Sequence, residues 1–196
     1  TDMMGRCVSL NTVKSKIAAC RRCGMKSLGY GAVYAASKDF YIKHPDWALY
    51  TSAGEPLVFI DVFYIMNIAR NSPWHEHIIA EYVKAVTEVG FDGIHMDTYG
   101  FPKTAFAKRN QTRDLIKLDE QYPDLIEDTK NALSKIKPDN DLIFNNVGNW
   151  PVSSVALSPQ DAVYIEVWEP YTRYSQIKQI IMDAKQARGE FLKNPL

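Results

Sequence analysis

Hydrophobic residues recur along the chain at two spacings, every three to four residues in some segments and every second residue or continuously in others. The first spacing is typical of helices with one buried face, and the second is typical of strands. Ser, Pro and Gly at the segment ends supply start and stop signals. Helices are expected at residues 9–23, 72–89, 123–136, 152–157 and 174–188, and strands at residues 25–36, 90–100 with a closing glycine turn, 142–147 and 161–168.

Helices and strands therefore alternate, which is the order of an α/β domain with a parallel sheet. A complete (β/α)8 barrel of the TIM type needs about 250 residues, so the four expected strands correspond to about half of one. The whole chain, residues 1–196, is expected to be a single partial barrel domain. A doubly wound sheet is the alternative, because no glycine-rich phosphate loop decides between them. Half a barrel exposes its sheet edges, so pairing of two copies into a homo-oligomer is expected.

In the strand within residues 90–100, apolar and polar residues occupy alternate positions. Ile94 and Met96 share one face, whereas His95, Asp97 and Tyr99 share the other. A strand with this second face lines a polar pocket, which suits the interior of a barrel better than the core of a sandwich.

Two strands carry acids with the same layout. Asp92 and Asp161 stand at their beginnings, and Asp97 and Glu166 follow five residues later at their ends. Ligands of parallel α/β sheets bind outside the carboxyl ends of the strands, which selects Asp97 and Glu166 and leaves the other two to the helix-to-strand turns.

Only the strand ending near Asn145 is expected between these two acids, because consecutive strands are usually neighbours. The two backbones would then lie about 9 Å apart, and two inward side chains can close that to the roughly 5–5.5 Å of a retaining glycosidase pair. The alternative for either acid is a buried ion pair, with Arg70 or Lys103 as the partner. Glu169 is a rival acid, but it lies past the strand and before Pro170.

Two long connections are expected, over residues 37–69 and, as a polar loop, over residues 100–121. The first is rich in aromatic residues, which either pack together under the loop or stack on a sugar ring. His75 and His77 are expected on the solvated start of the helix that follows.

Composition narrows the classes of partner. Lys plus Arg and Asp plus Glu both number 23, so no net charge attracts nucleic acid or an anionic membrane. No apolar run spans a bilayer and no signal-peptide pattern opens the chain. Neither end of the chain carries an obvious cap, so an excised segment of a longer protein is expected. An odd number of cysteines argues against a disulfide framework, and the four histidines supply no paired strand-end ligands, so neither a metal nor a cofactor is expected.

Five runs in order along nearly the whole chain resemble one family. They are YGAVYAAS, HPDWALY, FDGIHMDTYGFPK, IFNNVGNWP and SPQDAVYIEVWEPY, and they resemble glycoside hydrolase family 66, which contains dextranases and cycloisomaltooligosaccharide glucanotransferases. The resemblance implies a (β/α)8 barrel, represented here by roughly its third to sixth strands. The family tends to have a proline where Glu169 stands, so this chain has a second acid near the site.

The resemblance also implies the roles of the two acids. The nucleophile falls on Asp97 and the acid/base on Glu166, and the implied reaction is endo cleavage of α-1,6-glucan (dextran) by double displacement with retention. The candidate substrate-binding residues are Tyr34, His95, Tyr99, Asn145, Trp150 and Trp168. An extracellular or cell-surface location is expected, with the signal peptide outside this chain.

Three alternatives remain open at this point. A cyclising glucanotransferase would use the same chemistry with the glucan's own end as the acceptor. The chain could instead be an incomplete fragment that only binds sugar. A metal-dependent barrel hydrolase is disfavoured by the histidine pattern.

Overall fold

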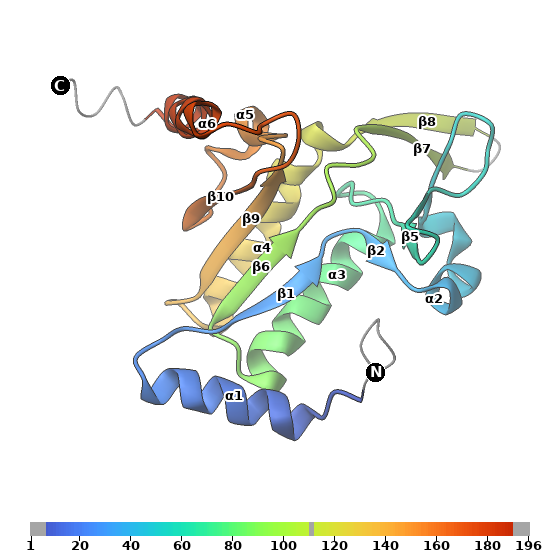
Figure 1. Cartoon of the computed structure of the whole chain (residues 1–196). Helices are drawn as coiled ribbons and strands as arrows, with labels where there is room; N and C mark the ends of the chain where they lie inside the picture. Colours follow the sequence, from blue (N-terminus) through green and yellow to red (C-terminus); the bar gives the residue numbers. More distant parts are fainter. Residues whose placement is uncertain (1–6, 110–111, 190–196) are drawn as a thin grey trace.

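The central feature is a four-stranded parallel sheet. The structure is a computed structural model that describes residues 7–109 and 112–189. The strand order is β1 (Leu28–Ala32), β6 (Gly93–Asp97), β9 (Asp141–Val147) and β10 (Ala162–Glu166), and every neighbouring pair is parallel (Figure 1). The predicted α/β class with a parallel sheet is confirmed, and within the described ranges the sheet is open and does not close into a barrel.

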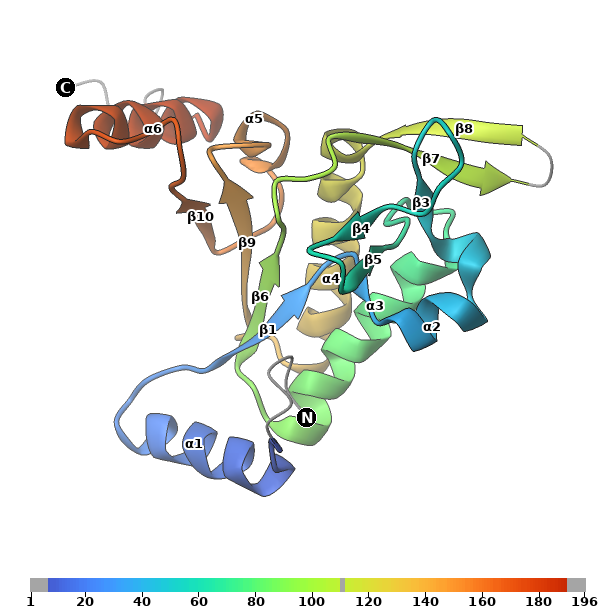
Figure 2. The same ribbon diagram turned by 45° about the vertical axis from the view of Figure 1, so that its right-hand side comes forward.

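Helices connect the strands of this sheet. The helices are α1 (Leu10–Arg22), α2 (Lys38–Lys43), α3 (Pro73–Lys84), α4 (Tyr122–Ile136), α5 (Val152–Val155) and α6 (Tyr174–Ala187), with shorter helical turns at η1 (Pro45–Trp47), η2 (Ala85–Val89) and η3 (Leu118–Glu120). Helices α3 and α4 lie side by side against one face of the sheet (Figure 2). None of the described helices combines the length and the hydropathy that a membrane span requires.

The main core lies between that face and the two helices. Ile94 and Met96 of β6 and Leu142 and Phe144 of β9 are buried there. They alternate with residues that point to the opposite face, as the period of a strand requires. The apolar parity predicted for the strand of Asp97 is therefore the helix-facing side.

Local signals explain where the helices begin and end. The Ser9 side chain accepts the Thr12 N–H at 3.3 Å at the start of α1. Helix α3 starts at Ser72-Pro73 and continues into η2, a π-helical turn that stops at Gly90, whose φ is 96°. A left-handed glycine ends a helix without the penalty that a Cβ would add.

The strand predicted over residues 25–36 is two strands. β1 ends at Ala32, and β2 (Ala35–Ala36) belongs to a separate three-stranded sheet with β5 (Phe63–Ile65) and β4 (Val58–Phe59). The break changes the direction of the side chains, so Tyr30 is exposed and Tyr34 is fully buried. An unbroken strand over residues 25–36 would place these two tyrosines on one face, and the break places them in different surroundings.

The connection predicted over residues 100–121 is not a loop but contains a hairpin. Its strands are β7 (Thr104–Arg109) and β8 (Thr112–Lys117), and β7 also pairs with β3 (Leu49–Tyr50). Among the described side chains of the two strands, only Ala105 is buried, and Leu115 is exposed. The apolar residues Ala105, Phe106 and Ala107 are consecutive and do not alternate with polar ones, so the hydrophobic pattern of the hairpin is weak.

The histidine at the start of α3 is not solvated. The His75 ring is buried, with Nδ1 2.8 Å from the Ile68 carbonyl oxygen and Nε2 3.0 Å from Asp128 Oδ2 on α4. Asp128 also accepts from Arg70 Nε at 2.7 Å. His75 therefore joins the two covering helices, and the prediction that it faces water is wrong.

Candidate active site

The two strand-end acids meet at one end of the sheet. Asp97 is the last residue of β6 and Glu166 the last residue of β10, with β9 between them. Because all strands run parallel, both acids lie at the carboxyl end. Their pairing residues on β9 are close in sequence, since β6 pairs Met96 with Phe144 and β10 pairs Glu166 with Val147.

A single amide links the two acids. Asn145 Nδ2 donates to Asp97 Oδ1 at 2.7 Å and to Glu166 Oε2 at 2.7 Å. These two oxygens are therefore no farther apart than twice that distance, which is compatible with the roughly 5–5.5 Å separation of a retaining pair. The reversed amide would place Asn145 Oδ1 against both carboxylates, so the hydrogen bonds fix its orientation.

A tyrosine from the neighbouring strand holds the other oxygen of Asp97. The Tyr30 hydroxyl donates to Asp97 Oδ2, from a position on β1 opposite His95. Burial, the hydrogen bond and the charge of Asp97 all raise the pKa of Tyr30 well above its usual range. The hydroxyl therefore stays protonated and remains a donor at any physiological pH, and both oxygens of the buried Asp97 are held by neutral groups.

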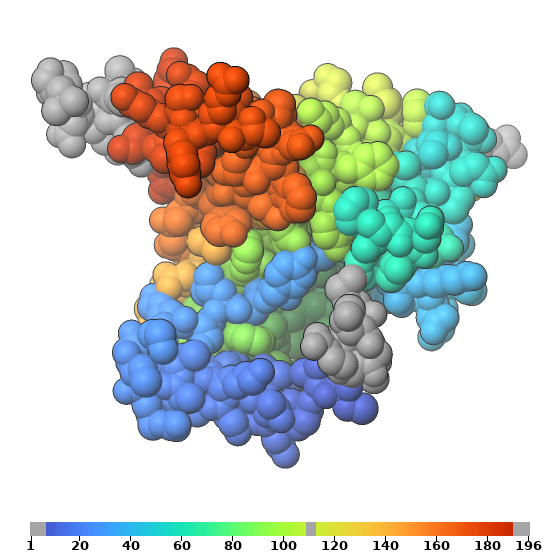
Figure 3. Space-filling view, viewed as in Figure 1, coloured from blue at the N-terminus to red at the C-terminus, as the bar shows by residue number. Residues whose placement is uncertain are grey.

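These acids border a pocket of about 440 Å³. It is lined by Phe59, Asp97, Thr98, Tyr99, Val147, Glu166 and Trp168. The space-filling view places the segments that follow β6 and β10 next to one another, beside the β4–β5 hairpin (Figure 3). A mostly apolar pocket with two converging carboxylates suits a ligand with apolar ring faces and polar edges.

Two of the predicted substrate-binding aromatic residues lie in this pocket. Tyr99 stands two residues after Asp97, and its half-buried position beside that carboxylate raises its pKa to about 12. Trp168 stands two residues after Glu166 and is 60% exposed. Asn145 lies directly beneath the pocket through its bonds to both acids.

The other predicted substrate-binding residues lie outside the lining of the pocket. Tyr34 is fully buried, and its hydroxyl accepts the Tyr99 N–H at 2.6 Å, so it supports the wall. Trp150 packs edge-on against Tyr122 beneath Lys103. His95 lies one step below Asp97 on the same face, in edge contact with the rings of Tyr30 and Tyr164.

Sequence reasoning missed four residues of the site, namely the lining residues Phe59, Thr98 and Val147 and the hydrogen-bond donor Tyr30. Tyr30 shares the face of Asp97 because it pairs opposite His95, a register that the sequence alone does not give. Phe59 lies in the aromatic-rich connection, where no periodicity indicates a direction. Glu169, the rival acid, is exposed and does not line the pocket.

Neither acid forms an ion pair with any residue in the described ranges. Arg70, one suggested partner, binds Asp124, Glu127 and Asp128 instead, and Lys103 lies over the ring of Trp150. The ion-pair alternative is therefore wrong for this site. In the same ranges, no group of three or more His, Cys, Asp or Glu residues is arranged to hold a metal ion.

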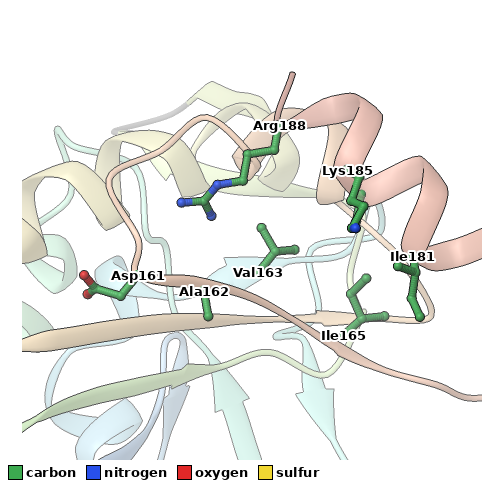
Figure 4. Close-up of a pocket in the computed structure, with 8 residues that line it drawn as sticks. Asp161, Ala162, Val163, Ile165, Ile181, Lys185 and Arg188 are labelled. Atoms are coloured by element: carbon green, nitrogen blue, oxygen red, sulfur yellow. The ribbon is translucent and has the colours of Figure 1, made fainter. Parts of the chain in front are cut away.

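A separate cavity of about 330 Å³ lies between β10 and α6. Figure 4 shows Asp161, Val163 and Ile165 on the strand side and Ile181, Lys185 and Arg188 on the helix side. It contains neither Asp97 nor Glu166, and it borders the edge strand of the sheet. It is therefore distinct from the site of the two acids.

Comparison with known proteins gives a consistent result. The sequence model of glycosyl hydrolase family 66 matches residues 1–193. Two cycloisomaltooligosaccharide glucanotransferases of Niallia circulans are 25% and 26% identical to this chain over 96% of its length. The chain spans about one fifth of these relatives, 20% and 21% of their lengths.

Solved structures agree with the sequence comparison. A cycloisomaltooligosaccharide glucanotransferase from Paenibacillus sp., complexed with cycloisomaltoheptaose, matches with a TM-score of 0.81 and 25% identity, over 96% of this chain and 28% of that one. A maltogenic α-amylase from Thermotoga neapolitana matches with a TM-score of 0.58 and 17% identity, over 93% of this chain and 37% of that one. The second likeness concerns the fold alone.

Proposed function

Because the chain belongs to glycosyl hydrolase family 66, we propose that it is the central part, roughly strands three to six, of a (β/α)8 catalytic barrel that cleaves α-1,6-glucan with retention of configuration. Asp97 is the nucleophile and Glu166 the acid/base. The single observation that carries this proposal is the Asn145 amide, which brings the two carboxylates to one opening at the carboxyl end of the sheet. Such a separation leaves room for a covalent intermediate and too little for a water between acid and sugar.

The reaction has two displacements. In the first, Glu166 protonates the glycosidic oxygen while Asp97 attacks the anomeric carbon, so the C–O bond to the leaving sugar breaks and an ester to Asp97 forms. In the second, the Glu166 carboxylate takes a proton from an acceptor hydroxyl, whose oxygen attacks the anomeric carbon and releases Asp97. Each displacement inverts the carbon, so the product keeps the configuration of the substrate.

The acceptor decides between two activities. With water, the enzyme is an endo-acting dextranase, and the exposed pocket beside Trp168 is accessible to water. With the free end of the same glucan, it is a cycloisomaltooligosaccharide glucanotransferase, as the relatives in both comparisons are. Both candidates use Asp97 and Glu166 in the same roles.

Product analysis separates these candidates. The protein is incubated with α-1,6-glucan and, as the matched control, with α-1,4-glucan, and early products are resolved into linear and cyclic forms and examined for anomeric configuration by NMR. Linear α-products indicate hydrolysis and cyclic products indicate transglycosylation. β-Products contradict the retaining mechanism, and binding without any cleavage leaves the sugar-binding fragment as the function.

Azide assigns the two roles independently. In Asp97→Gly, azide replaces the nucleophile and a single displacement of 4-nitrophenyl α-isomaltoside yields a β-glycosyl azide. In Glu166→Ala, azide intercepts the ester to Asp97 and yields the α-glycosyl azide. The opposite pairing of variants and products would reverse the assignment.

A further inference from the structure

The pocket of the two acids has one aromatic wall that does not follow from the position of the acids. Phe59, the last residue of β4, stacks face to face on Tyr99, with ring centroids 4.3 Å apart and planes at 11°. Both rings line the pocket of Asp97 and Glu166. The pair therefore joins the segment that follows β6 to a hairpin that belongs to a separate sheet.

The two acids have different aromatic neighbours. Tyr99 follows Asp97 by two residues and brings Phe59 to that side, whereas Trp168 follows Glu166 by two residues. In a double displacement, the nucleophile bonds to the sugar that stays, and the acid protonates the oxygen of the sugar that leaves. A ring that accompanies the nucleophile would therefore face the sugar that stays, and a ring that accompanies the acid would face the sugar that leaves.

The turn after Phe59 is strained. The Val62 N–H donates to the Phe59 carbonyl oxygen at 3.2 Å, and the two central residues, Ile60 and Asp61, have φ values of 48° and 57°. Such a turn is normally built from Asn and Gly, and a β-branched residue in the left-handed region is an outlier. Strain of this kind persists where the surroundings fix it, and it gathers at ligand clamps.

We propose that the Phe59–Tyr99 pair forms the donor-side subsite, which holds the glucose units that remain bound to Asp97, while Trp168 contacts the leaving sugar. This inference depends on the function proposed above and adds the side on which each ring acts. The apolar ring faces of a glucopyranose unit match the stacked rings, and the contacts that hold the strained turn also hold Phe59 in place. The ligand class is an α-1,6-linked glucose chain.

The competing explanation is packing, because the same pair also borders an apolar groove of about 870 Å³ along β1 and α3. Phe63 allows the two explanations to be separated. It borders the groove and contacts Tyr99 with ring centroids 6.0 Å apart, but it does not line the pocket of the acids. Phe63→Ala is therefore the matched control.

The test uses two substrates. In 4-nitrophenyl α-isomaltoside, both glucose units lie on the donor side and no sugar lies on the other, whereas α-1,6-glucan occupies both sides. Phe59→Ala should raise KM roughly tenfold for both substrates, and Phe59→Tyr should restore it. Trp168→Ala should raise KM for the glucan only, and Phe63→Ala should change neither.

The possible failures are distinguishable. If the unsubstituted protein cleaves neither substrate, the proposed function fails and the subsite with it. If it cleaves both, the proposed function stands, and the KM values of the variants decide on the subsite. The subsite is wrong if Phe59→Ala leaves both KM values unchanged, raises KM for the glucan alone, or changes KM as much as Phe63→Ala does.

Discussion

The two ends of the central sheet each carry a pair of acids, and their surroundings differ. At the amino ends of β6 and β10, Asp92 lies 3.1 Å from Arg21 Nη2, and Asp161 lies 2.7 Å from Lys130 Nζ. At the carboxyl ends, Asp97 and Glu166 are held by an amide and a tyrosine, and no described cation pairs with them.

The backbone also takes part at the amino ends. Asp92 accepts the Ser27 N–H at 2.9 Å, and Asp161 accepts the Leu142 N–H at 2.7 Å. Burial opposes ionisation of Asp92, but the Ser27 N–H, Arg21 and Lys137 outweigh it and leave its pKa below the usual range. These acids tie a connection to the strand that follows.

The difference has a physical interpretation. A cation neutralises a carboxylate and stabilises the fold around it. A neutral donor orients a carboxylate but leaves its charge in place, so the carboxylate can still form a bond or exchange a proton. Identical acids five residues apart on one strand therefore serve stability at one end and, as proposed above, chemistry at the other.

The largest effect on turnover is expected from substitution of Asp97, the acid at the carboxyl end of β6. Asp97→Asn should lower turnover of α-1,6-glucan at least about 10³-fold, because the amide is a poor nucleophile. The free energy of unfolding should change by no more than about 1 kcal/mol. Initial rates and urea unfolding measure the two quantities, and a turnover near that of the unsubstituted protein would refute the role of Asp97.

Removal of the linking amide should have the next largest effect. Asn145→Ala leaves two carboxylates without their shared donor, and kcat should fall about 10²-fold. The adjacent Asn146 is the matched control, since its amide donates to the Tyr164 carbonyl oxygen at 2.9 Å from the other face. Asn146→Ala should lose stability without this loss of kcat, and equal kcat values in the two variants would contradict the linking role.

Substitution at the amino end should affect stability instead. Asp92→Asn removes the charge that Arg21 and Lys137 face and weakens the bond to the Ser27 N–H. The free energy of unfolding should fall by about 2 kcal/mol, with kcat within about twofold of its original value. Urea unfolding curves and kinetics on one preparation check both parts. A loss of kcat in fully folded Asp92→Asn protein would contradict the purely stabilising role of the amino-end acid.

A smaller effect is expected from the tyrosine that orients Asp97. Tyr30→Phe removes one of the two donors to the carboxylate, and kcat should fall about tenfold while KM changes little. Tyr164→Phe on the same face is the control, because Tyr164 contacts His95 but does not line the pocket. A rise in KM with unchanged kcat would show that Tyr30 binds sugar and does not orient Asp97.

The smallest effect concerns pH. The pKa values of Asp92 and Asp161 are lowered on folding from a usual value near 3.8, so the folded state binds fewer protons. Their contribution to stability is complete above that value and is lost as the pH falls through the lowered pKa values. Asp161 is half exposed, so it should contribute less than about 1 kcal/mol and weaken with salt. Urea midpoints from pH 6 to pH 3 for the unsubstituted protein and Asp161→Asn measure it; parallel curves would contradict it.

The strand-end acids could be predicted from the sequence because their signals are local. Parity, strand length and the carboxyl-end rule act within one strand each, so Asp97 and Glu166 required no knowledge of distant contacts. The same logic correctly separated Asp92 and Asp161 as residues of the turns.

The rest of the site depends on contacts between distant segments. Tyr34 does not point as an unbroken strand would direct it, because the strand ends after Ala32. Phe59 reaches the pocket through the β4–β5 hairpin, which no hydrophobic periodicity in the sequence indicates. The position of His75 at a helix start is typical of a solvated residue, and only its contact with Asp128 of another helix shows why it is buried. Such contacts follow from tertiary packing, which overrides local preference.

The hydroxyl of Tyr30 reaches Asp97 from β1, which is the outermost strand on its side of the sheet among the strands that the structure describes. Outer strands open more readily than inner ones, because only one of their edges is bonded. The orientation of the proposed nucleophile is therefore coupled to the opening of β1. A segment that bonds to the outer edge of β1 would make Asp97 more rigid without touching it, and fraying of that strand would loosen it.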